Sequence, residues 1–195
     1  TIEGPYKKKK EILGTMSHNA IYAYSKHDQM HLIYHIGNGD NPESCNPYYK
    51  CYNGTTPTCQ GLKPPKDQGN ATCSHSAVAS IMYTKDYLNQ EWINAGEIKF
   101  DATNMPVTGG LSNPSPLIKE DGSVLLISRG KDGTTLSNGT RIINHNIVLF
   151  EAPSWNGTYT FVKSNGVNGT INVGDGKIPT EDPVLYKGRR GYHII

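Results

Sequence analysis

The chain has 195 residues, which is enough for one domain with a core of its own. Hydrophobic residues make up only 35% and charged residues 18%, whereas Gly, Pro and Tyr number 21, 12 and 12, a composition typical of short strands joined by turns. The formal net charge of +2 does not favour a nucleic-acid partner. No apolar run approaches the roughly 20 residues of a membrane-spanning helix. We therefore expect an all-β protein with no nucleic-acid partner and no membrane span.

Three stretches share one layout, in which a polar head precedes an apolar strand, a turn and a second strand. They cover residues 17–36, 112–129 and 180–195. Their apolar and polar residues alternate with a period of two, which indicates half-buried strand pairs. We predict one β-hairpin in each stretch and name the polar residues before its first strand the head.

The segments between these hairpins predict further strands at residues 76–83 and 146–151, and turns at residues 131–134 and 137–139. Four strands per repeated unit are typical of a propeller blade. A two-sheet sandwich is the alternative, but it does not predict the repeated head and hairpin. We therefore expect residues 1–195 to form a single β-propeller domain.

The last repeat stops inside its second strand and the first begins in the middle of a unit. Because an open sheet edge is a liability, we expect the domain to be incomplete at both ends. Either the rest of a longer chain or copies of the same chain would then cover the open strand edges.

Residues 38–75 form a Cys-, Gly- and Pro-rich insertion with no hydrophobic periodicity. It holds all the cysteines, Cys45, Cys51, Cys59 and Cys73, none of them in the paired C-x-x-C spacing of a zinc site. We expect two disulfides that pin this loop and no metal; three pairings are possible, and sequential ones are favoured.

N-x-T sequons are more frequent than the two or three that chance would give, roughly, at this composition. Most of them read Asn-Gly-Thr, which is also a turn signal. Together with the cysteines they favour an N-glycosylated protein that is extracellular or at the cell surface. The sequons lie at Asn53, Asn70, Asn138, Asn156 and Asn168.

Several motifs of the chain, taken in order, resemble those of one superfamily. They are Gly4-Pro5-Tyr6, Ser17-His18-Asn19, residues 32–37, Asn113-Pro114-Ser115-Pro116, residues 121–126, Glu181-Asp182-Pro183-Val184-Leu185-Tyr186 and Gly191-Tyr192-His193. They resemble the five-bladed β-propeller glycosidases of glycoside hydrolase families 43, 32 and 62, and family 43-like secreted proteins most. The resemblance implies a partial five-bladed propeller that hydrolyses polysaccharide or glycan linkages with a Glu as general acid and without a cofactor.

In this superfamily, successive blades each place an acidic residue on the innermost strand. Here only the third head is acidic, and it supplies the candidate catalytic residues Glu181 and Asp182. On an extended segment the two would point to opposite faces. Glu181 is then the preferred general acid, and Asp182 would bind backbone or a cation. The candidate substrate-binding residues at the other heads and hairpins are His18, Asn19, Asn113, Ser115 and Arg129.

Two hypotheses follow, because an acidic pair before Pro also caps a strand and Asn-Pro is also a turn signal. The first is a secreted, carbohydrate-active hydrolase. The second is a non-catalytic extracellular glycoprotein, either a glycan-binding module or a structural subunit of a surface filament or sheath.

Overall fold

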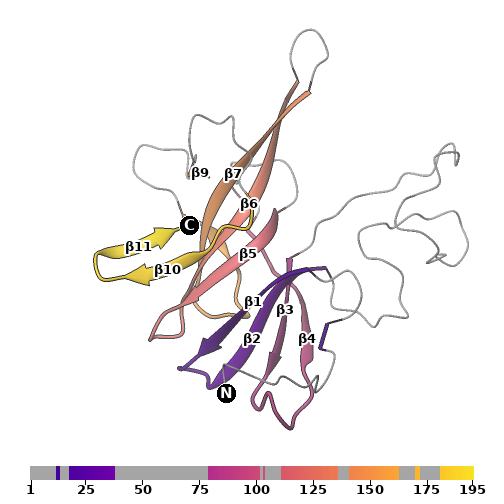
Figure 1. The fold of residues 1–195 in the computed structure, drawn as a ribbon, viewed down its shortest axis with the longest axis vertical. Helices are drawn as coiled ribbons and strands as arrows, with labels where there is room; N and C mark the ends of the chain where they lie inside the picture. The colour runs from indigo at the N-terminus through magenta and orange to yellow at the C-terminus, as the bar shows by residue number, and fades with distance from the viewer. Residues whose placement is uncertain are drawn as a thin grey trace, which may run out of the picture.

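The computed structural model describes residues 12–13, 18–37, 79–101, 103, 111–135, 141–162, 170–171 and 181–195. Within these ranges the regular secondary structure consists of β-strands alone. The strands pair into antiparallel sheets, none of them closed into a barrel (Figure 1). The described part of the chain has no helix long and apolar enough to cross a membrane. The predicted all-β class is confirmed. The cysteine-rich insertion and the disulfides predicted in it lie outside the described residues.

The first sheet has the order β1 (His18–Ser25), β2 (Met30–Ile36), β3 (Ala79–Thr84) and β4 (Ile93–Glu97), each strand antiparallel to the next. The first predicted hairpin is therefore confirmed. At its turn, the hydroxyl of Ser25 donates a hydrogen bond of 2.6 Å to Asp28, which lowers the pKa of that carboxyl.

The second sheet has the order β5 (Leu111–Ile118), β6 (Val124–Thr135), β7 (Arg141–Ala152) and β8 (Thr160–Phe161), and β9 (Thr170–Ile171) also pairs with β7. The hairpin of β5 and β6 confirms the second prediction.

The turn predicted at residues 131–134 is wrong. These residues continue β6 and pair in unbroken register with β7, from Lys131 opposite His145 to Thr134 opposite Ile142. Ladder hydrogen bonds on every residue outweigh the local turn preference of Asp-Gly. The turn predicted at residues 137–139 lies outside the described residues.

The third hairpin consists of β10 (Leu185–Gly188) and β11 (Gly191–Ile194), as predicted. Two backbone hydrogen bonds of 3.0 Å between Val184 and Ile195 extend its ladder. β5 contacts both β1 and β10, so the first strands of the three hairpins are neighbours (Figure 1).

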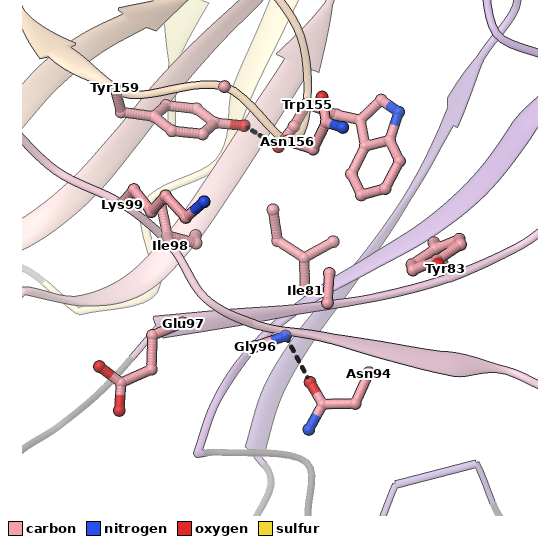
Figure 2. Close-up of a pocket in the computed structure, with 12 residues that line it drawn as sticks. Ile81, Tyr83, Asn94, Gly96, Glu97, Ile98, Lys99, Trp155, Asn156 and Tyr159 are labelled. Carbon is pink, nitrogen blue, oxygen red and sulfur yellow. Dashed lines mark hydrogen bonds between the residues drawn. The ribbon is translucent and has the colours of Figure 1, made fainter.

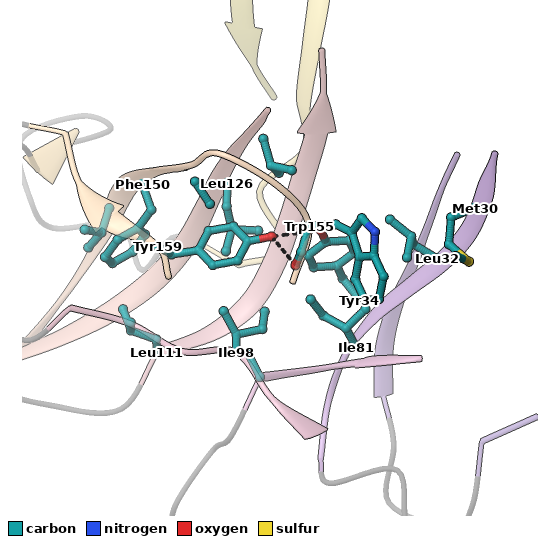
Figure 3. Packing of buried hydrophobic residues seen from close by; sticks show 14 residues of the cluster. Met30, Leu32, Tyr34, Ile81, Ile98, Leu111, Leu126, Phe150, Trp155 and Tyr159 are labelled. Atoms are coloured by element: carbon teal, nitrogen blue, oxygen red, sulfur yellow. Dashed lines mark hydrogen bonds between the residues drawn. The ribbon is translucent and has the colours of Figure 1, made fainter. Parts of the chain in front are cut away.

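One apolar core joins the first two sheets (Figure 3). At its centre the hydroxyl of Tyr159 donates to the carbonyl of Trp155 at 3.0 Å and lies 2.9 Å from the hydroxyl of Tyr34. Burial raises the pKa of both phenols, so both stay neutral and hydrogen-bonded. A second cluster, built around Ile127, Ile147 and Leu185, packs the third hairpin against the second sheet.

Candidate functional site

The first strands of the first two hairpins contain a β-bulge at the same place. In β1 the pairing passes from His18–Ile36 to Ile21–Tyr34, and in β5 it passes from Ser112–Arg129 to Ser115–Ile127. Each strand therefore holds one residue more than its partner over this step. A bulge bends the strand and redirects the side chains beside it.

The same backbone conformation recurs in all three heads. Asn19, Asn113 and Asp182 have φ of +53°, +52° and +44°. These lie in the left-handed region, which Asn and Asp enter more readily than other non-glycine residues. Asp182 is thus the residue of the third head that corresponds to the two asparagines, and the prediction that Glu181 and Asp182 lie on an extended segment is wrong.

The three heads converge on one carboxylate. The amide nitrogens Nδ2 of Asn19 and Asn113 both donate to Oδ1 of Asp182, and the hydrogen bond from Asn113 measures 2.7 Å. The same nitrogen of Asn113 lies 3.4 Å from Oε2 of Glu181. Side chains from positions separated by up to 163 residues therefore form one polar group. We call Asn19, Asn113, Arg129, Glu181 and Asp182 the head cluster.

Glu181 is the acidic residue that pairs with a cation. Its Oε2 accepts a hydrogen bond from the guanidinium of Arg129, whose side chain is 13% exposed, whereas that of Glu181 is 58% exposed. A carboxylate this exposed gains little stability from the ion pair, so the pair orients the side chain more than it stabilises the fold. The prediction placed Glu181 at the centre and Asp182 against backbone or a cation; in the structure Asp182 is central and Glu181 contacts the cation.

The head cluster has a buried floor and an open side. Asn113 is 4% exposed, while Asp182 and Glu181 are exposed to solvent. The cluster offers carboxylate acceptors beside amide and guanidinium donors. Among the described residues, no group of three or more His, Cys, Asp or Glu side chains is suited to hold a metal ion.

Ser115 lies below this cluster and binds the neighbouring hairpin. It is 1% exposed, and its hydroxyl accepts a hydrogen bond of 3.0 Å from the backbone N–H of Leu185. The structure thus gives it a partner within the protein that links β5 to β10. Ser128, which the sequence analysis did not single out, similarly fastens the second head by donating 2.7 Å to the carbonyl of Ser112. A lone serine in the apolar run of residues 124–128 was the signal for it.

The remaining predicted residues divide into described and undescribed ones. The side chain of His18 lies outside the described part of the structure. Asn156 is exposed at a turn and does not belong to the head cluster. The other sequon residues, Asn53, Asn70, Asn138 and Asn168, lie outside the described residues, as do Cys45, Cys51, Cys59 and Cys73.

No protein-family model, no curated protein and no solved structure matches the chain. The resemblance to propeller glycosidases therefore rests on the sequence motifs.

Proposed function

We propose that the chain forms blades of a carbohydrate-active, five-bladed β-propeller and that the head cluster is its saccharide-binding site. The observation that carries the proposal is the convergence of three equivalent heads on Asp182. In a propeller the innermost strands of successive blades meet around a central axis, and the contacts of β5 with both β1 and β10 support that arrangement.

The chemistry of the head cluster suits a ligand rich in hydroxyl groups. Each sugar hydroxyl both donates and accepts a hydrogen bond. The carboxylates of Glu181 and Asp182 accept, and the guanidinium of Arg129 and the amides donate. The buried floor holds these groups in place before the ligand arrives, which reduces the entropy lost on binding.

Hydrolysis by the head cluster would use its two carboxyl groups, since glycoside cleavage requires one acid and one carboxylate. Asp182, whose Oδ1 accepts hydrogen bonds from two amide donors, would activate water or attack. Glu181, whose side chain is 58% exposed, would then act as general acid on the leaving oxygen.

Glycan binding without cleavage is the second candidate. It is favoured by the observation that both carboxylates come from one head, while the other two heads contribute amides that transfer no proton. In either case we propose an extracellular or cell-surface location, which the sequons and the clustered cysteines support.

The test measures hydrolysis of chromogenic arabinosides, xylosides and galactosides by the chain and by Glu181→Gln and Asp182→Asn. Glu120→Gln is the matched control, because Glu120 is an exposed carboxylate at the turn between β5 and β6. If the cluster is catalytic, each cluster variant loses about 100-fold or more in rate and the control loses none.

Binding of oligosaccharides is measured on the same proteins. Binding without hydrolysis, abolished by Asp182→Ala, selects the second candidate. Neither hydrolysis nor binding by the unaltered chain would overturn the proposal.

A further inference from the structure

A groove of about 390 Å³ lies between β4 and the turn at residues 153–157, and it shares no residue with the head cluster (Figure 2). Its floor includes Ile81 and Trp155, and its rim includes Asn94, Lys99 and Asn156. The volume falls within the range of small-ligand sites, and the lining combines polar and apolar groups.

The groove lies beside β4, the last strand of the first sheet. The two segments that form it join at one end, where Tyr159 N–H donates to Lys99 O at 2.8 Å and Asp101 N–H donates to Tyr159 O at 2.9 Å. They diverge along β4, and no described strand pairs with the outer edge of β4. Within the described part of the chain, the groove therefore borders the backbone edge of β4.

The turn on the opposite side of the groove presents a sequon, Asn156-Gly157-Thr158. A backbone hydrogen bond of 3.1 Å from Gly157 N–H to Ser154 O closes the turn. The hydroxyl of Ser154 donates 2.9 Å to Oδ1 of Asn156, so the side-chain oxygen is fixed while the residue stays exposed. The amide nitrogen is the atom that N-glycosylation modifies, and it lies on a residue that lines the groove.

We propose that Asn156 carries an N-linked glycan whose first sugars lie in this groove against β4. Covalent attachment at the rim keeps these sugars at high effective concentration over the groove, so weak contacts are enough to hold them there. Sugar hydroxyl and N-acetyl groups would bind the side chains of Glu97 and Lys99, and the apolar faces of the sugars would contact Trp155. The proposal requires export of the chain through a glycosylating pathway and does not depend on the function of the head cluster.

The test begins with the chain secreted from a eukaryotic host. Peptide mass spectrometry measures occupancy of Asn156, and hydrogen exchange measures the amides of residues 93–97. Thr158→Ala removes the sequon but keeps Asn156, Asn156→Gln removes the attachment point, and Thr158→Ser keeps the sequon as matched control. The same proteins made in a bacterium, without glycans, report any effect of the substitutions themselves.

We expect Asn156 to be occupied and exchange in β4 to be slower, by about threefold to tenfold, in the secreted chain and in Thr158→Ser than in the two other variants. The bacterial proteins should exchange alike. An unoccupied Asn156 would overturn the proposal. The proposal would also be overturned if Asn156 is occupied but β4 exchanges at the same rate in all secreted proteins, after correction for the rate differences seen among the bacterial proteins.

Discussion

At the scale of single residues, the central finding is that a carboxylate and two amides occupy the same strained position in three heads. Left-handed conformations of non-glycine residues typically cost about 1–3 kcal/mol each and persist only where the surroundings hold them. Here the hydrogen bonds from Asn19 and Asn113 to Asp182 hold all three. Such strain gathers at binding and catalytic sites, which agrees with the function proposed for the head cluster.

Asn113 is the residue whose loss should disturb the head cluster most, because its buried amide contacts both Asp182 and Glu181. Asn113→Ala removes these charge-assisted bonds and puts Ala, which tolerates a left-handed conformation less well than Asn, at positive φ, so the free energy of unfolding should fall by about 2–4 kcal/mol. Asn113→Gly, which relieves the backbone, should cost less. Urea unfolding measures both. Two variants as stable as the parent would contradict the role given to this amide.

His35 should make stability depend on pH. It is fully buried in β2, which lowers its pKa, and its Nε2 has no hydrogen-bond partner among the residues that the structure describes. Below about pH 6.5 the unfolded chain therefore binds a proton that the folded chain resists, and the free energy of unfolding falls as the pH falls.

His35→Gln removes this pH-dependent contribution to the free energy of unfolding. Urea unfolding between pH 7.5 and pH 5 should show that the parent loses more stability than the variant over the same interval. Parallel pH profiles for the two proteins would rule out the contribution of His35.

At the scale of secondary-structure elements, period-two alternation was enough to predict the three hairpins but not the bulges. Alternation reports which face of a strand is buried, and it says nothing about φ at a single residue such as Asn19. Residue type gave a partial signal, since Asn and Asp are the residues that tolerate a left-handed conformation. The extended head predicted for Glu181 and Asp182 is wrong because the positive φ of Asp182 redirects both side chains, and no pattern in the sequence shows that angle. The Lys131–Thr134 extension was missed because its pairing with β7 is non-local.

The link between β5 and β10 should depend on Ser115. Ser115→Ala leaves the buried N–H of Leu185 without its acceptor, which typically costs about 1–3 kcal/mol. Compared with the parent, Ser115→Ala should speed up hydrogen exchange in β10 and β11 more than in β6 and β7. Ser123→Ala is the matched control, because its hydroxyl bonds an exposed carboxylate, that of Asp121, at a turn. Equal effects of the two substitutions on β10 would contradict the link.

At the scale of the whole molecule, the buried tyrosine pair joins the first two sheets. Tyr34 belongs to β2, while Tyr159 follows the turn after β7, and their hydroxyls lie 2.9 Å apart in the shared core. The two sheets should therefore unfold together.

A double-mutant cycle with Tyr34→Phe and Tyr159→Phe tests this coupling. Each single variant leaves a buried hydroxyl without one partner, so the two losses should not add, and the coupling energy should be about 0.5–1.5 kcal/mol. Thermal unfolding followed by circular dichroism and by tyrosine fluorescence measures it. Additive losses would show that the pair does not couple the sheets.

The central claim is that the head cluster binds saccharide, and the side-chain amides of Asn19 and Asn113 report on it directly. Their NMR signals, assigned by comparison with Asn19→Asp and Asn113→Asp, are followed while xylo-, arabino- and galacto-oligosaccharides are added. We predict that at least one of these sugars shifts both amide signals together, saturably, and that Asp182→Ala abolishes the binding while Glu120→Gln preserves it. Amide signals that no sugar moves, or binding that survives Asp182→Ala, would contradict the claim.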